Sequence, residues 1–307
     1  MASDVIKVED MTVTYNDGTT AVDNVSLSIN QGTFFGFLGP NGAGKTTLVK
    51  TLATLLKPTS GSITINGYDT VTDPRKVRES IGYMPQRTSV DEELTARENL
   101  LFACDAYNVP SGEQVSRVDE LLDLVQLKDV ADKRAEAFSG GMQKRLDAAT
   151  ALVHQPPLVF LDEPTTGLDP AARQKLWDYF QRINNAGTTF FLTTQYLEEA
   201  DKLCDDIAVM QTGDILVRDS PKALKQRVGG DIIGVETSQA EAAAQAIQDA
   251  FDATIQTEDN TVSITVRNAS KVVTDILIVL RDNDISIQNL SIREPTLDDV
   301  FLALTNT

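Results

Sequence analysis

The segment GPNGAGKT at residues 39–46 lies between an apolar run, Thr33 to Leu38, and helix-forming residues at 47–52. A strand, a glycine-rich turn and a helix in this order predict a loop whose backbone N–H groups close on phosphate oxygens. The helix N-terminus adds positive partial charge at the same place. Lys45 should reach the β- and γ-phosphates of a nucleotide, and the Thr46 hydroxyl should ligate Mg²⁺. The predicted nucleotide-binding residues of this segment are Gly39, Pro40, Asn41, Gly42, Ala43, Gly44, Lys45, Thr46 and Thr47.

The length and composition indicate a globular protein. A chain of 307 residues suits one large domain and one small domain, and 41% hydrophobic with 23% charged residues is globular composition. Apolar runs such as Ile276 to Leu280 are far too short to span a membrane, and residues 1–7 do not read as a secretory signal. Two cysteines are too few for a disulfide framework and fit a reducing cytoplasm, which is the expected location.

The net charge of −18 argues against a nucleic-acid partner, because no surplus of Lys and Arg is present to neutralise phosphates. The same acidity fits two kinds of source. It is typical of cytosolic proteins in salt-accumulating organisms, and it is also found in ordinary acidic bacterial proteins.

The chain before the loop predicts two antiparallel strands. Apolar residues alternate from Val5 to Tyr15 and again from Ala21 to Ile29, and Asn16, Asp17 and Gly18 between them favour a hairpin turn. Tyr15 ends the first strand ahead of the phosphate loop, where its ring could stack on an adenine base. The alternative is a half-buried strand tyrosine.

Two carboxylates follow a second apolar run. Residues 158–161 read as a buried parallel strand, and Asp162 and Glu163 come directly after them. Asp162 is expected to hold Mg²⁺, through water, and Glu163 to polarise the water that attacks the γ-phosphate. A solvated strand end is the common alternative, but the phosphate loop upstream favours the catalytic interpretation.

Gln86 lies where a strand gives way to a loop, so its amide can approach both the metal and the attacking water. Helical apolar spacing over 94–106 and 115–127 predicts a helical insertion at about 88–138. A second glycine-rich segment, Phe138-Ser139-Gly140-Gly141-Met142, follows and opens another helix. It offers a second helix N-terminus to an anion.

In this order the motifs resemble the ABC-type ATPases over residues 4–220. Gln86 corresponds to the Q-loop, 139–142 to the signature, 158–163 to Walker B and Gly167-Leu168-Asp169 to the D-loop. The resemblance implies an α/β P-loop NTPase fold with an antiparallel β subdomain and a helical subdomain. It implies that ATP, with Mg²⁺, lies between the P-loop of one subunit and Ser139, Gly140 and Gly141 of a second, with Asp169 nearby. A homodimer is therefore expected.

Two positions depart from the family pattern. Met142 replaces a common Gln and should be tolerated, because Ser139 and backbone amides would make the phosphate contacts. Gln195 stands where the family usually delivers a histidine to the γ-phosphate, and its amide can donate a hydrogen bond but cannot take a proton at neutral pH. Glu163 must then be the base, and hydrolysis should be slower or differently pH-dependent. His154, the single histidine, is expected to be structural.

The C-terminal part predicts a small second domain. A basic helical stretch ending at Gly229-Gly230 makes 221–230 a candidate linker. Strands at 232–237, 253–257, 261–267 and 285–292, with helices at 240–251 and 271–281, give a β-α-β-β-α-β order. This order predicts a ferredoxin-like α+β domain over 231–307.

Residues 293–304 and the segment TTQYLEEA, 193–200, are similar to daunorubicin-resistance-type exporter ATPases. This resemblance implies a separate ABC-2 type membrane subunit, a peripheral place on the inner face of the membrane, and export of hydrophobic drug-like or lipid-like compounds. The groove between the Gln86 loop and the helical insertion would receive a coupling helix. The alternatives are a soluble regulatory ABC ATPase and an ATP-dependent clamp with negligible turnover. A GTPase is disfavoured because no Asn-Lys-x-Asp motif occurs.

Overall fold

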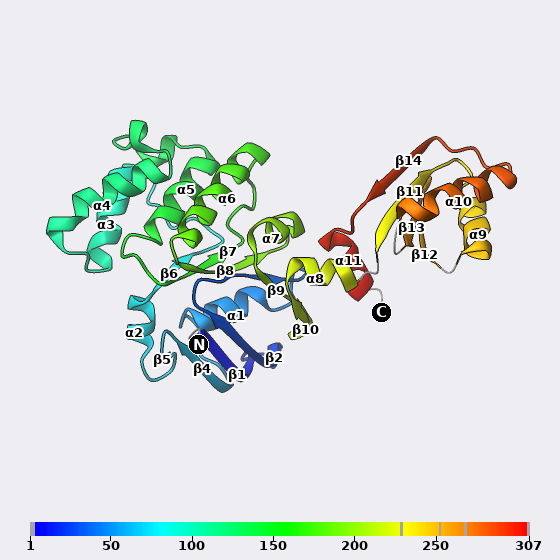
Figure 1. Cartoon of the computed structure of the whole chain (residues 1–307). Coiled ribbons are helices and arrows are strands. Elements are labelled where there is room, and N and C mark those ends of the chain that lie inside the picture. The colour runs from blue at the N-terminus through cyan, green and yellow to red at the C-terminus, as the bar shows by residue number, and fades with distance from the viewer. Residues whose placement is uncertain (1–3, 228–229, 252, 267–268, 306–307) are drawn as a thin grey trace. The chain divides into compact units, whose positions relative to one another are not determined.

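A computed structural model describes residues 4–227, 230–251, 253–266 and 269–305 (Figure 1). The chain divides into two compact units at Asp219 and Ser220. In the parts of the chain that the structure describes, no helix combines the length and apolar character needed to cross a bilayer. Cys104 and Cys204 are both buried and free.

The first unit begins with an antiparallel sheet in the order β2-β1-β4-β5. Its strands are β1 (Asp4–Thr14), β2 (Thr20–Asn30), β4 (Ser60–Ile65) and β5 (Tyr68–Asp69). The predicted hairpin between β1 and β2 is confirmed. Its turn is held by Asp17, whose Oδ1 accepts the N–H of Thr19 at 2.9 Å, and Gly18 supplies a positive φ of 86°.

The centre of the first unit is a six-stranded sheet in the order β10-β9-β3-β8-β7-β6. Strand β10 pairs antiparallel to β9, and the other neighbours are parallel. The strands are β3 (Phe34–Leu38), β6 (Ile81–Met84), β7 (Leu158–Asp162), β8 (Thr189–Thr194), β9 (Asp206–Gln211) and β10 (Asp214–Asp219). Every residue of β3, β7 and β8 is buried, as the apolar runs of β3 and β7 predict. Phe191 packs at 5.4–5.8 Å between ring centroids from Phe35, Phe37 and Phe160, which locks the three strands together.

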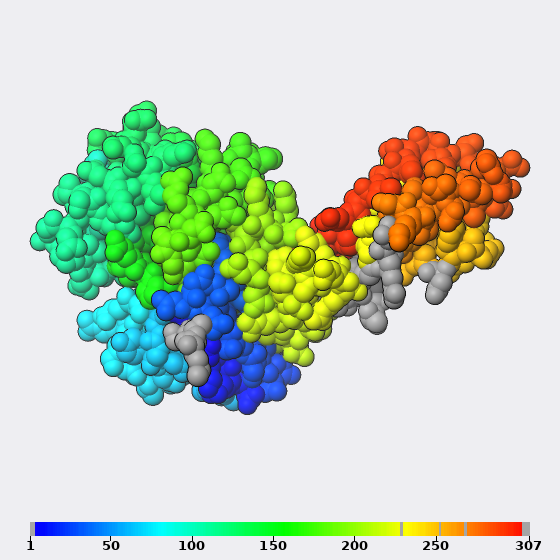
Figure 2. All heavy atoms as spheres, in the orientation of Figure 1, coloured from blue at the N-terminus to red at the C-terminus, as the bar shows by residue number. Residues whose placement is uncertain are grey.

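Within residues 4–219, seven helices lie around these sheets. They are α1 (Lys45–Leu52), α2 (Pro74–Glu79), α3 (Ala96–Ala106), α4 (Ser111–Leu124), α5 (Gly140–Thr150), α6 (Pro170–Asn185) and α7 (Leu197–Leu203), with short 3-10 turns at Lys128–Val130 and Ala135–Ala137. The helices α3 and α4 occupy the region where the sequence predicts a helical insertion. In Figure 2 this region and the N-terminal strands occupy opposite sides of the first unit.

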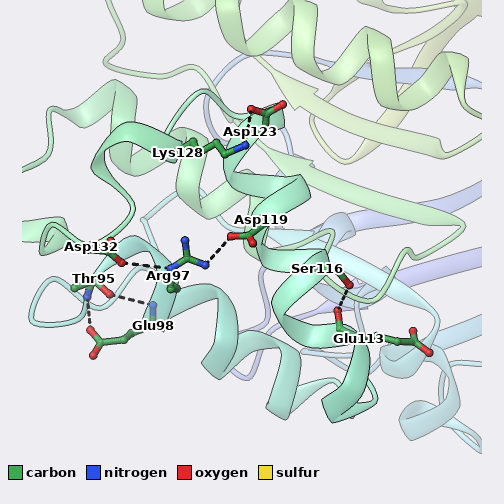
Figure 3. A network of polar contacts seen from close by, with 9 residues as sticks. All are labelled: Thr95, Arg97, Glu98, Glu113, Ser116, Asp119, Asp123, Lys128 and Asp132. Carbon is green, nitrogen blue, oxygen red and sulfur yellow. Dashed lines mark hydrogen bonds and ion pairs between the residues drawn. The ribbon is translucent and has the colours of Figure 1, made fainter.

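Side-chain contacts fix the beginning of α3 and its packing on α4 (Figure 3). Thr95 and Glu98 form a capping box in which each side chain accepts the other residue's backbone N–H. Arg97 then donates to Asp119 on α4 at 2.7 Å and to Asp132 at 3.3 Å. One guanidinium therefore joins three segments of the helical region.

The second unit contains an antiparallel sheet in the order β12-β13-β11-β14. Its elements are α8 (Pro221–Arg227), β11 (Asp231–Glu236), α9 (Ala240–Ala250), β12 (Thr254–Glu258), β13 (Thr261–Val266), α10 (Ala269–Asp282), β14 (Asn289–Arg293) and α11 (Leu297–Thr305). Ile247 of α9 and Ile276 of α10 join Ile233 and Ile264 of the sheet in one buried core. This strand order and these two helices agree with the predicted ferredoxin-like arrangement.

The second unit differs from the sequence prediction at its last strand and its last helix. The last strand begins at Asn289 and not at Ile285, because the N–H of Ile285 donates to Leu280 O and closes α10. Strand pairing starts only after Gln288 N donates to Glu236 O. Helix α11 was not predicted from the sequence. Arg267, predicted in a strand, and Gly229, predicted in the linker, lie outside the described residues.

Candidate nucleotide site

The segment 39–46 joins β3 to α1, and its backbone geometry depends on glycine. Gly44 is the N-cap of α1 with φ 107°, and a Cβ there would stand 2.1 Å from Ala21 O. A larger residue at this position would therefore collide with backbone and strain its own. The loop borders a cavity of about 330 Å³. The cavity is lined by Tyr15, Ala21, Asn41, Gly42, Ala43, Gly44, Lys45, Thr46, Thr47, Gln86 and Glu163.

Lys45 is a buried cation held by the loop itself. Its side chain is 5% exposed, and Nζ donates to Gly39 O at 2.6 Å and to Pro40 O at 3.1 Å. Burial lowers the pKa of Lys45, and the attraction of Glu163 and Asp162 opposes that shift. Because its two protein partners are neutral carbonyls, the ammonium can still gain from an anion that enters the cavity.

Asp162 ends the buried strand β7 and Glu163 follows it, and both are buried, which excludes the solvated strand end. Asp162 Oδ1 accepts the Thr193 hydroxyl at 2.6 Å and lies 3.5 Å from Thr46 Oγ1. A threonine hydroxyl beside a carboxylate provides the hard oxygen ligands that Mg²⁺ takes. The residues present therefore fit this ion.

Glu163 is held in an unusual backbone conformation. Its φ is 49°, and its N–H donates to Thr193 O at 3.0 Å. Such left-handed non-glycine residues cost on the order of 1–3 kcal/mol and cluster at functional sites. Glu163 Oε2 accepts Gln86 Nε2 at 3.0 Å and Thr166 Oγ1 at 3.3 Å. The structure therefore places the predicted Gln86 and Glu163 in direct contact.

Tyr15 stands at the edge of the same cavity. Tyr15 is 42% exposed, and its hydroxyl shares a 2.8 Å hydrogen bond with Thr47 Oγ1. The phenol is thereby anchored to α1, and the ring remains accessible to a flat ligand.

The second glycine-rich segment borders a different cavity of about 250 Å³. This cavity is lined by Ser139, Gly141, Met142, Arg145, Asp169, Ala171, Ala172 and Lys175. Ser139 is the N-cap of α5, where its Oγ accepts Met142 N at 3.3 Å, and Gly140 opens the helix. Asp169 caps α6 by accepting two N–H groups at 3.0 Å. Both side chains thus have a structural task within their own chain.

Gln195 and His154 do not line the nucleotide cavity. Gln195 is exposed directly after β8 and belongs to the lining of neither cavity described above. His154 stacks on Tyr107 at 3.9 Å between ring centroids, and its Nε2 lies 3.0 Å from Ile81 O. The sequence prediction of a structural histidine agrees with this packing.

Sequence reasoning missed four residues that contact the predicted site. Thr193 and Thr166 contact Asp162 and Glu163, as described above. Lys144 and Asp147 contact the loop that follows β6, through Lys144 Nζ to Gln86 O at 2.6 Å and Ser89 N to Asp147 Oδ1 at 3.3 Å. Polar residues on a helix give no signal in sequence of such distant partners.

Comparison with known proteins gives a consistent result. A family model described as "ABC transporter" matches residues 22–166, and one described as "ATP-binding protein DrrA1-3-like, C-terminal domain" matches residues 220–305. The chain is 40% identical to the daunorubicin resistance ATP-binding protein DrrA3 of Streptomyces coeruleorubidus over 99% of this chain and 97% of that protein. It is 35% identical to the linearmycin resistance ATP-binding protein LnrL of Bacillus subtilis over 93% and 94%.

A solved structure has the same fold in the first unit. It is a dimeric post-hydrolysis state of an ATP-binding cassette bound to ADP and Pi, with a TM-score of 0.64 and 29% identity, covering 70% of this chain and 98% of that one.

Proposed function

The chain belongs to the ATP-binding subunits of ABC transporters, and from that membership we propose how its site hydrolyses ATP and what it works with. It is an ATPase. The observation that carries the proposed chemistry is the contact of Gln86 with Glu163 beside the cavity that Lys45 also lines.

We infer a division of roles within that cavity. Lys45 and the loop N–H groups bind the phosphates, while Thr46, Asp162 and the Gln86 amide hold Mg²⁺. Glu163 takes the proton of the attacking water, and Gln86 and Thr166 orient its carboxylate. Tyr15 stacks on the base. When bound, Mg²⁺ supplies positive charge that stabilises the charge developing on the transferred phosphate.

We further propose a homodimer in which two chains enclose each nucleotide. Within the described residues, the two cavities have no lining residue in common, so a single chain offers its two glycine-rich segments at separate places. The Ser139 oxygen accepts Met142 N, which leaves the hydroxyl proton free to donate to a phosphate. Gly140 and Gly141 add backbone N–H groups at the start of α5. Asp169 holds the D-loop in place by capping α6.

The proposed transport partner is a membrane subunit of the ABC-2 type, and the proposed cargo is a hydrophobic drug-like or lipid-like compound. Relatives named for daunorubicin, doxorubicin and linearmycin resistance support this class of cargo. The chain would then lie on the inner face of the membrane. We propose that the membrane subunit docks on the helical region, where Phe102 of α3 is 70% exposed.

Replacing Glu163 tests the catalytic assignment. In Glu163→Gln, phosphate release should fall by about 10²–10⁴-fold, because the amide cannot take a proton, while ATP binding stays near the wild-type value. Glu136→Gln, at an exposed glutamate of the helical region, is the matched control and should keep full turnover. Full turnover in Glu163→Gln would refute the assignment.

Replacing Phe102 tests the membrane partner. The chain should copurify with a six-span membrane protein encoded beside it, and Phe102→Asp should reduce that copurification without changing the ATPase rate of the isolated chain. The control is Val71→Asp, at another exposed apolar residue, outside the helical region. If no membrane protein copurifies with the wild type, the result would favour the alternative of a soluble regulatory ATPase.

A further inference from the structure

Helix α5 carries two buried charged residues that the proposed chemistry does not use. Lys144 is 9% exposed and Asp147 is 1% exposed. They are three residues apart and therefore lie on the same face of the helix. Since an isolated buried charge is costly, each must have partners that compensate for lost water.

Lys144 is bound to the backbone of Gln86. Its Nζ donates to Gln86 O at 2.6 Å, a charge-assisted bond. Burial lowers the pKa of Lys144, but Asp147, Asp162 and Glu163 act against that shift and favour the charged form. The ammonium is thus bound to the backbone of Gln86 and is attracted by the carboxylates of the nucleotide site.

Asp147 is bound to the same loop three residues further on. Its Oδ1 accepts both the N–H and the hydroxyl of Ser89. Burial raises the pKa of Asp147, and the Ser89 contacts and the Lys144 charge oppose the rise. The loop after β6 is therefore attached to α5 at residues 86 and 89.

These contacts connect the first turn of α5 with the Gln86–Glu163 pair. The first turn of α5 contains the segment that would bind the nucleotide of a second chain. About one turn later, Lys144 holds Gln86, whose amide contacts the proposed base Glu163 at 3.0 Å. A small shift of α5 must therefore move the amide that orients this carboxylate.

We propose that Lys144 and Asp147 are positioning residues that link the Ser139 end of α5 to the Gln86–Glu163 pair of the same chain. Engagement of Ser139, Gly140 and Gly141 with the nucleotide held by the second subunit would fix the hydrolytic geometry around the chain's own nucleotide. The two sites of the dimer would then turn over cooperatively. This inference rests on the proposed function, because it requires the two-chain enclosure of ATP.

The test measures steady-state ATPase kinetics of the full chain and binding of a fluorescent ATP analogue. The wild type should give a Hill coefficient above one. Lys144→Met should lower kcat by at least about tenfold and bring the Hill coefficient to about one, with the dissociation constant of the analogue nearly unchanged. Lys144→Arg, which keeps a cationic donor, should restore both. Lys128→Met, at an exposed lysine 3.6 Å from Asp123, is the matched control and should behave as wild type (Figure 3).

The outcomes separate the inference from the proposed function. Wild-type hydrolysis with a Hill coefficient of one, or Lys144→Met with unchanged kcat and cooperativity, would overturn the link while leaving the ATPase intact. Absence of any phosphate release by the wild type would instead overturn the proposed function. If Lys144→Met does not fold, as judged by circular dichroism, Ser89→Ala replaces it. That variant removes only the hydroxyl donor of Asp147, so a reduced Hill coefficient is expected, and an unchanged one counts against the link.

Discussion

Acidification should destabilise the first unit through its single histidine. The ring of His154 is stacked on Tyr107, and its Nε2–H donates to Ile81 O, because a carbonyl can only accept. Nδ1 is buried and has no hydrogen-bond partner among the residues that the structure describes, so a proton there would place a charge in a site without an acceptor. Burial lowers the pKa of His154 to about 4, and nearby Arg117 also lowers it, against the raising effect of the Ile81 hydrogen bond.

The direction and size of this loss of stability follow from the linkage between protonation and folding. The pKa of His154 is lowered in the folded chain, so its contribution to stability is complete above the unfolded value of 6.5 and is lost as the pH falls towards 4. The difference between the unfolded and folded pKa corresponds to about 3.4 kcal/mol of unfolding free energy when His154 is fully protonated. Between pH 7.5 and pH 5, about 2 kcal/mol of it is lost.

Urea unfolding at pH 7.5 and pH 5 measures this loss. Trp177 is the single tryptophan, and it is buried in α6, so its fluorescence reports the first unit alone. His154→Gln keeps a donor for Ile81 O but does not titrate. The free energy of unfolding of the wild type should therefore fall by about 2 kcal/mol more than that of the variant. Equal losses in both proteins would refute the reasoning, because the other titrating groups, such as Asp147 and Glu199, are common to both.

Three further changes have definite expected results. Gly44→Ala should abolish binding of a fluorescent ATP analogue, since its Cβ would meet Ala21 O at 2.1 Å, whereas Gly18→Ala, with φ 86° in open space, should retain it. Gln195→His should add a limb near pH 6.5 to the plot of kcat against pH, and an unchanged profile would contradict a role for this position in turnover. Phe160→Ala should lower the free energy of unfolding, followed by Trp177 fluorescence, by about 3–5 kcal/mol, because it empties the aromatic cluster around Phe191. A loss below about 1 kcal/mol would mean that the cluster collapses around the gap.

The fold was predictable wherever one local pattern specified an element. The β1–β2 hairpin, the buried strands β3 and β7 and the β-α-β-β-α-β order within the second unit all follow from periodicity and turn residues. The position of β9 between β10 and β3 did not follow, since no local signal states which strands pair. The start of β14 was placed too early because Ile285 is apolar, although its N–H closes the preceding helix.

The site was predictable where function requires a fixed residue type at a fixed spacing. The glycine loop, Asp162, Glu163 and Gln86 are such cases, and the structure brings them together. Lys144 and Thr193 could not be recognised, because their partners lie far away in sequence, and a lysine on a helix is usually a solvated residue. Asp169 was placed at the nucleotide from its motif alone, and its capping of α6 depends on backbone geometry that the motif does not state.

The position of Gln195 bears on which group controls hydrolysis. In this chain the carboxylate of Glu163 already has two donors, Gln86 and Thr166, whereas Gln195 is exposed beyond the end of β8. Among the described residues, Gln195 makes no hydrogen bond to Glu163, so the orientation of this carboxylate depends on Gln86 and Thr166. Gln86 is attached through Lys144 to the helix that would receive the nucleotide of the second chain. The timing of hydrolysis is then expected to depend on Gln86 and α5 more than on the residue at the usual histidine position.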